Sequence, residues 1–166
     1  MNALLEILRQ LKLEGMRAAV EAMEEQGSSQ LEDLRPVLLR LLDAESAHRK
    51  QLTTECLTIK ARFHYSAGIQ SVATGVDRNL GQDLLERLAT TRWVSPGQNV
   101  LITGPTGAGK SYLASALGRQ ACQHGHSTIY FHCNRLWPML AAARKRDTYG
   151  KELRKIAKTE LLILDD

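Results

Sequence analysis

The chain has 166 residues, 43% of them hydrophobic and 24% charged, which is typical of a soluble globular protein with one domain or with one domain and part of another. No apolar run approaches the roughly 18 residues that cross a membrane, and Glu6 stands where a signal peptide needs basic residues. The cysteines Cys56, Cys122 and Cys133 form no C-x-x-C pair, which disfavours a disulfide framework or a zinc site. We therefore expect a cytoplasmic protein with reduced thiols and no membrane partner.

The net charge of +4 is unevenly distributed along the chain. Residues 1–50 carry 7 basic and 9 acidic side chains, whereas residues 51–166 carry 15 basic and 9 acidic ones. The densest basic stretch consists of Arg144, Lys145, Arg146, Lys151, Arg154, Lys155 and Lys158. Such a stretch can neutralise phosphates of a nucleic acid, but a solvated helix with i,i+4 ion pairs has the same pattern, so both interpretations stay open.

Residues 1–62 are expected to form a small N-terminal all-α domain. Apolar residues recur at three- and four-residue steps in residues 2–26, and Gly15 is expected to divide this stretch into two short helices. A turn is expected at residues 27–29, where Gly27 suits a helix C-terminus. This pattern fits a domain that packs only on itself as well as one that docks with a partner.

A longer helix is expected from residue 34 to residue 61. Pro36 fits this helix only within its first turn, where the missing N–H group is harmless. Residues 63–98 are rich in glycine and weakly patterned, and we interpret them as a connector. One helical segment, residues 82–90, is expected inside this connector.

The strongest chemical signal is a match to the phosphate-binding pattern G-x-x-x-x-G-K-[ST]. Residues 99–103 before it are β-branched and apolar, as in a buried strand, and residues 111–124 after it carry apolar side chains at helical spacing. The motif therefore stands between a strand and a helix, as a nucleotide-binding loop does. The residues expected to bind the nucleotide are Gly104, Pro105, Thr106, Gly107, Ala108, Gly109, Lys110, Ser111 and Tyr112.

Each part of this loop has an expected role with ATP. The glycines let backbone N–H groups approach an anion, and the helix N-terminus adds its positive dipole end. Lys110 is expected to reach the β- and γ-phosphates, both to bind and to assist catalysis, and the Ser111 hydroxyl is expected to hold Mg²⁺. The alternative is a glycine-rich surface turn, which the flanking strand and helix disfavour.

The remaining residues predict a partial P-loop ATPase domain over residues 99–166. Residues 127–132 predict a strand, residues 134–146 and 150–158 predict helices, and residues 161–164 predict a central parallel strand that is buried on both faces. This alternation indicates an α/β fold with a parallel sheet of the P-loop NTPase type.

Two carboxylates follow the last strand directly. A carboxylate at a strand tip beside the phosphate-binding loop can hold Mg²⁺ through water, and we assign this Walker B role to Asp165. Asp166 is the candidate catalytic residue that polarises the attacking water. An ordinary strand end is the alternative, but the 55 positions between Lys110 and Asp165 leave room for the elements that would bring them together.

The chain resembles the IstB family, the helper ATPases of bacterial insertion sequences, and the resemblance covers essentially the whole chain. Residues 11–16 (Leu-Lys-Leu-Glu-Gly-Met) resemble the opening of that family, and residues 60–63 (Lys-Ala-Arg-Phe) resemble its connector. Residues 104–111 and 161–166 supply the two ATPase motifs. The family belongs to the AAA+ class and is similar to the DnaC-type helicase loaders.

The resemblance implies a protein that binds ATP and Mg²⁺, assembles as a homo-oligomer on DNA without sequence specificity, and assists the transposase of the same insertion sequence. It makes the basic stretch at residues 144–158 a candidate DNA contact. Family members continue for many tens of residues past the paired aspartates. The resemblance therefore also implies a sheet that is incomplete at the C-terminus, without the sensor strand and the arginine finger, and weak hydrolysis of ATP.

Three other functions remain as alternatives. A DnaC-type helicase loader would share the ATPase core but serve a replicative helicase. A non-catalytic fragment would dock with a partner through the helical domain while its phosphate-binding loop stays inert. A P-loop kinase for a small molecule would need a lid and a substrate pocket, which the sequence does not indicate.

Overall fold

The computed structural model describes residues 3–25, 29–75 and 79–166. The chain divides into two compact units, Met1–Leu52 and Thr53–Asp166. None of the helices in the described residues combines the length and the apolar character that crossing a membrane requires.

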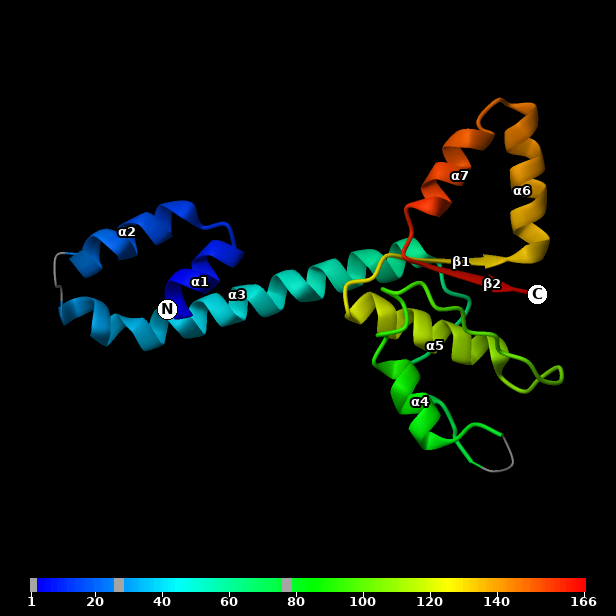
Figure 1. Ribbon diagram of the computed structural model, residues 1–166, viewed down its shortest axis with the longest axis horizontal. Helices are drawn as coiled ribbons and strands as arrows, with labels where there is room; N and C mark the ends of the chain where they lie inside the picture. The colour runs from blue at the N-terminus through cyan, green and yellow to red at the C-terminus, as the bar shows by residue number, and fades with distance from the viewer. Residues whose placement is uncertain (1–2, 26–28, 76–78) are drawn as a thin grey trace. The chain divides into compact units, whose positions relative to one another are not determined.

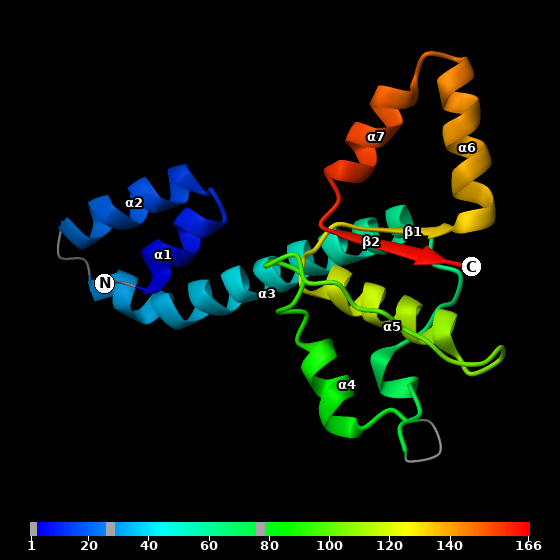
Figure 2. The same cartoon turned by 45° about the vertical axis from the view of Figure 1, so that its right-hand side comes forward.

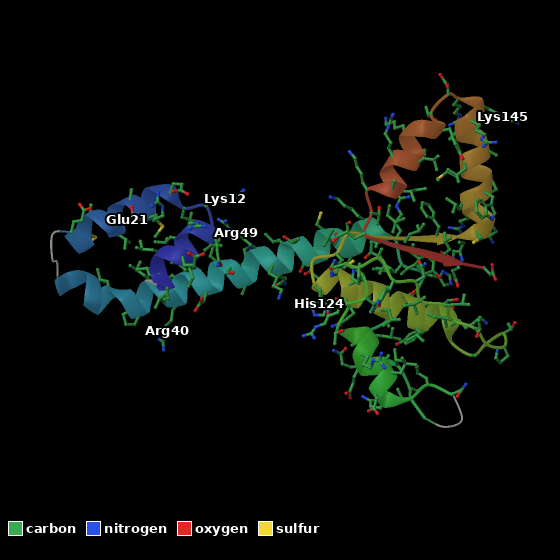
Figure 3. All side chains as sticks on the ribbon, in the orientation of Figure 1. Lys12, Glu21, Arg40, Arg49, His124 and Lys145 are labelled. Carbon is green, nitrogen blue, oxygen red and sulfur yellow. The ribbon has the colours of Figure 1, made fainter. Side chains whose placement is uncertain are left out.

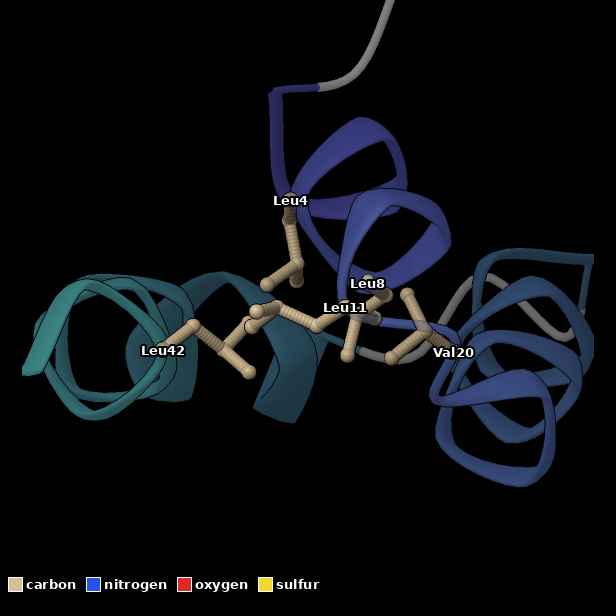
Figure 4. Close-up of a cluster of buried hydrophobic side chains, with 5 residues drawn as sticks. All are labelled: Leu4, Leu8, Leu11, Val20 and Leu42. Carbon is tan, nitrogen blue, oxygen red and sulfur yellow. The ribbon is translucent and has the colours of Figure 1, made fainter. Parts of the chain in front are cut away.

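The described residues of the first unit form helices and the short turn between the first two of them. Helix α1 spans Ala3–Gln10, α2 spans Glu14–Glu25, and the first part of α3, which spans Ser29–Ala61, completes the unit. Its hydrophobic core takes side chains from all three helices and from the turn after α1 (Figure 4). The buried core residues are Leu4, Leu8, Leu11, Val20 and Leu42.

The break between the first two helices lies before Gly15, not at it as the sequence predicted. Lys12 adopts a left-handed backbone conformation with a φ of 57°. The N–H of Leu13 donates to the carbonyl of Leu8 at 2.9 Å, and the N–H of Lys12 donates to that of Arg9 at 3.0 Å. This pair of bonds is the Schellman pattern that ends helices, so α1 ends without a glycine and Gly15 lies inside α2.

The expected position of Pro36 is also wrong, because α3 begins at Ser29 and Pro36 lies in its second turn. Proline removes one backbone hydrogen bond of the helix there.

A side-chain contact joins α3 to the turn after α1: Arg49 Nη1 donates to the carbonyl of Leu11 at 3.0 Å, and Figure 3 shows Arg49 beside the turn that carries Lys12. The predicted turn at residues 27–29 lies mostly outside the described residues.

The second unit is α/β, as predicted. Helix α5 packs against both strands, and α6 and α7 lie on the other side of them (Figures 1 and 2). The elements of this unit after α3 are the 3₁₀ turn η1 (Ile69–Ser71), α4 (Gln82–Ala89), α5 (Lys110–Gln123), β1 (Thr128–His132), α6 (Cys133–Lys145), α7 (Tyr149–Ala157) and β2 (Leu161–Asp165). Each predicted helix and strand from residue 82 onward, except residues 99–103, is present within one or two residues.

Strands β1 and β2 pair in parallel, with Thr128 opposite Leu161 and His132 opposite Asp165. Because parallel strands have their carboxyl ends at the same edge, this register brings the last residue of β1 beside Asp165. The connection between the strands runs through α6 and α7, as a crossover between parallel strands requires.

Two expectations about strands are wrong. Residues 99–103 form no strand, since none of their backbone N–H groups bonds another backbone group of the described chain, and Leu101 is 88% exposed. Strand β2 is half-buried on one face only: Ile163 faces α5, whereas Leu162 and Leu164 are exposed. An apolar run becomes a strand buried on both faces only where a neighbouring strand and a covering layer are present.

Candidate nucleotide-binding site

The loop at residues 104–109 has the backbone geometry of a phosphate-binding turn. Gly107 and Gly109 have φ values of 80° and 89°, which side chains other than glycine rarely allow. Gly109 is the N-cap of α5, so the helix begins at Lys110 and its first N–H groups are directed toward the loop. Residues 103–109, including Thr106 and Ala108, are exposed. The loop is therefore open to an anion from solvent.

The Lys110 ammonium lies within its own loop. Its Nζ donates to the carbonyls of Gly104 and Pro105, each at 2.9 Å. Both acceptors are neutral, and a phosphate oxygen is a stronger acceptor for an ammonium than a carbonyl is. The lysine is thus held where it can exchange two carbonyls for the oxygens of a phosphate.

Ser111 and Asp165 come together although they are 54 positions apart. The Ser111 Oγ, in the first turn of α5, donates to Asp165 Oδ1 at 2.9 Å. The Asp165 side chain, at the end of β2, is only 14% exposed. This contact places a hydroxyl and a carboxylate side by side at the start of the phosphate-binding helix.

Two further side chains hold the same carboxylate, and the sequence did not predict either. The Tyr130 hydroxyl donates to Asp165 Oδ2, and His132 Nδ1 lies 3.4 Å from that oxygen. Tyr130 is 5% exposed; burial raises the pKa of its phenol and the hydrogen bond to Asp165 raises this pKa further, so Tyr130 remains a donor. Both residues lie on one face of β1, a signal that pairing residues 127–132 with residues 161–166 would have revealed.

The two remaining predicted site residues lie beside this cluster without joining it. Asp166 follows β2, is exposed, and makes no hydrogen bond with any residue that the structure describes. Tyr112 is half-buried in α5, and its ring centroid lies 6.0 Å from that of Tyr65.

The ligand chemistry of the site suits Mg²⁺ with a nucleotide. Mg²⁺ prefers oxygen ligands and is held by one or two protein groups together with phosphates and water. The Ser111 hydroxyl and the Asp165 carboxylate are oxygen ligands at the mouth of a loop whose N–H groups and Lys110 favour phosphate. The residues present therefore fit both the nucleotide and the metal.

The basic stretch at residues 144–158 covers the end of α6 and all of α7. All seven lysines and arginines in it are exposed, and none forms an ion pair with a residue of the described ranges. Arg144 lies over the ring of Tyr149, with its Cζ 4.8 Å from the ring centroid. The i,i+4 ion pairs of the alternative interpretation are therefore not formed here.

Comparison with known proteins gives a consistent result. A family model described as IstB-like ATP binding protein matches residues 6–166. An ATP-binding protein of the insertion sequence IS1162 from Pseudomonas fluorescens is 38% identical over 160 residues, which cover 96% of this chain and 69% of the relative. An insertion-sequence ATP-binding protein from Sinorhizobium fredii is 33% identical over 162 residues, with 98% and 65% covered.

A more distant relative is the ATP-binding protein of the insertion sequence IS21 from Pseudomonas aeruginosa, which is 28% identical over 166 residues. The match covers 100% of this chain and 63% of that protein. The chain thus spans about two thirds of the length of the curated relatives it matches.

Proposed function

The chain belongs to the family of IstB-like ATP-binding proteins, and from this membership we propose that it binds ATP with Mg²⁺ and acts in DNA transposition. The observation that carries the nucleotide site is the contact of Ser111 with Asp165 at 2.9 Å. It joins the start of the phosphate-binding helix to the tip of β2, as the paired motifs of a P-loop ATPase require.

Each residue of the site would have a distinct role with the nucleotide. The backbone N–H groups of residues 104–111 would surround the phosphates, and Lys110 would leave the carbonyls of its loop to bind the β- and γ-phosphates. Ser111 and Asp165 would hold Mg²⁺, which when bound neutralises phosphate charge. Asp166, exposed just beyond Asp165, would orient the attacking water.

The proposal extends to partners. The names of the relatives place them in insertion sequences, so we propose the transposase of the same element as the protein partner and DNA as the second partner. The exposed basic stretch at residues 144–158, without ion pairs in the described chain, supports a contact with phosphates. Assembly of several copies on DNA belongs to the same proposal.

A titration with a fluorescent ATP analogue tests the nucleotide site. We expect saturable binding that Mg²⁺ strengthens. Lys110→Ala should weaken binding at least about tenfold with or without the metal, because it removes charged hydrogen bonds to phosphate. Asp165→Ala should weaken binding only when Mg²⁺ is present. Unchanged affinity of the Lys110 variant would contradict the site, and equal effects of Asp165→Ala in both conditions would contradict its metal role.

Turnover is a separate question. Release of phosphate by the purified chain, with and without DNA, measures it. Either outcome of this measurement leaves the proposed binding of ATP intact.

A further inference from the structure

A cavity lies beside the nucleotide site, where β1 is followed directly by α6. Its volume is about 430 Å³, which is within the range of small-ligand sites. The connector after α3, strand β1 and helix α6 supply its walls. The lining residues are Arg62, Phe63, His64, Tyr130, Phe131, His132, Arg135 and Met139.

The charged side chains that line this cavity are all basic. No carboxylate is among the lining residues. Arg62 and Arg135 are exposed, and neither makes a hydrogen bond or ion pair with any residue of the described ranges. The Asp165 carboxylate contacts the lining residue Tyr130, but it already accepts bonds from Ser111 and from Tyr130 itself. Two unpaired guanidinium groups at one cavity match the oxygens of a phosphate.

The other side chains that line the cavity are aromatic rings and the flexible apolar side chain of Met139. Phe63 and Tyr130 form an edge-to-face pair with ring centroids 6.4 Å apart, and His64 and His132 form another at 4.8 Å. Phe131 and Met139 complete the apolar surface. Aromatic rings beside arginines are the surface on which proteins stack the bases of single-stranded nucleic acids.

We propose that this cavity holds one nucleotide of a single-stranded nucleic acid, with a phosphate on Arg62 and Arg135 and the base against the aromatic lining. This inference rests on the proposed function for DNA as the partner class, but its residues are not those that bind ATP. Tyr130 and His132 touch both the cavity and Asp165, so an occupied cavity borders directly on the nucleotide site.

The test measures binding of a short fluorescent oligo-dT to the full chain at several salt concentrations. The double variant Arg62→Gln/Arg135→Gln should bind at least about tenfold more weakly, because charged hydrogen bonds are lost. The slope of log affinity against log salt should fall by roughly 0.7 for each phosphate contact removed. The matched control is Arg87→Gln/Arg92→Gln, which removes two exposed arginines of the same unit outside the cavity and should change affinity less than about twofold.

Binding of the ATP analogue is measured on the same samples. Normal ATP affinity in the double variant shows that it is folded. If the wild-type chain binds no ATP analogue, the proposed function is overturned. If the chain binds ATP but not oligo-dT, or if the double variant and the control lose oligo-dT affinity equally, the cavity proposal alone is overturned. Binding of free dTMP as tight as that of oligo-dT would also overturn it, because the ligand would then be a mononucleotide.

A photo-crosslink gives a second, independent readout. An oligonucleotide with 5-iodouracil should attach to the aromatic lining, at Phe63, His64 or Phe131. Crosslinks confined to α7 would overturn the cavity as the site of the base.

Discussion

The Asp165 carboxylate receives hydrogen bonds from two different elements: Ser111 at the start of α5 binds one oxygen, and Tyr130 in β1 binds the other. A carboxylate with both oxygens engaged is fixed in orientation before any ligand arrives. We therefore regard Tyr130 as a positioning residue for the carboxylate that we propose binds the metal.

Tyr130→Phe tests this role. The variant loses one hydrogen bond but keeps the ring and its packing with Phe63. The expected effect is a loss of about 1 kcal/mol in binding of the ATP analogue with Mg²⁺, and no change without the metal. Isothermal titration with and without the ion measures it. Equal losses in both conditions, or a large drop in melting temperature, would indicate a structural role only.

At this scale the sequence predicted two site residues that the structure brings into contact, and it did not predict the side chains that surround Asp165. Ser111 and Asp165 could be paired because the two motifs have fixed residue types and a compatible spacing. Tyr130 and His132 belong to no motif. Their place beside Asp165 depends on the register of β1 against β2, which no single residue in either strand specifies.

At the scale of the secondary-structure elements, the Glu160 side chain joins the segment before β2 to the segment before β1. Its Oε2 accepts from the Ser127 N–H at 2.8 Å, and its Oε1 lies 3.0 Å from His126 Nδ1. These bonds, that of His126 first, hold the pKa of Glu160 below its ordinary value. The stabilisation is therefore fully present above the ordinary pKa of 4.5 and is lost as the pH falls through the lowered pKa of the folded state.

Glu160→Gln should remove this acid-dependent part of the stability. Melting temperatures taken from neutral pH to below pH 4.5 should fall less steeply in the variant than in the wild type. Glu152→Gln is the control, because the Glu152 carboxylate has no hydrogen-bond partner in the described residues. Parallel curves for the wild type and Glu160→Gln would contradict the role of Glu160.

Helix α5 lies close to its neighbours at Gly118. A Cβ at this position would stand 2.4 Å from Phe63 Cε1 and 2.7 Å from Ile163 Cδ1. Gly118→Ala should therefore destabilise the second unit by about 1–3 kcal/mol, less a gain of up to about 1 kcal/mol in helix propensity.

The control for this substitution is Gly150→Ala in α7, where a Cβ would meet nothing within 4 Å. That variant should be neutral or slightly stabilising, and urea denaturation compares the two. A stable Gly118→Ala variant would show that the ring of Phe63 can move aside.

At the scale of the elements, the periodicity of apolar residues was sufficient to predict most helices and strands. Helices α4 to α7 and both strands have clear patterns bounded by glycines or polar residues, and the predictions of their positions are confirmed. Residues 99–103 have the composition of a strand, but strand structure is a property of two neighbouring segments. The early end of α1 depended on Lys12 taking a backbone conformation usually left to glycine.

For the molecule as a whole, the hydrophobic cluster of the first unit and the nucleotide site belong to different compact units. Leu8→Ala should destabilise the first unit by about 2–5 kcal/mol, because it leaves a cavity among buried leucines. Affinity for the ATP analogue should remain within about twofold, because ATP contacts only the second unit in our proposal.

Circular dichroism followed on heating, with ATP binding measured below the transition, tests this prediction. Leu41→Ala is the control, because Leu41 lies in the same unit, on α3, but is 62% exposed. A loss of ATP affinity in the Leu8 variant alone would show that the two units are energetically coupled.

The two bonds of Lys110 to its own loop have a consequence for the working cycle of the protein. When a nucleotide departs, the ammonium does not remain without acceptors, because the carbonyls of Gly104 and Pro105 can receive it again. The loop thus stabilises the nucleotide-free state, which lowers the affinity below that of a site whose ammonium has no other acceptor. We therefore expect the site to release its nucleotide and bind another repeatedly, and not to retain the first nucleotide that it binds.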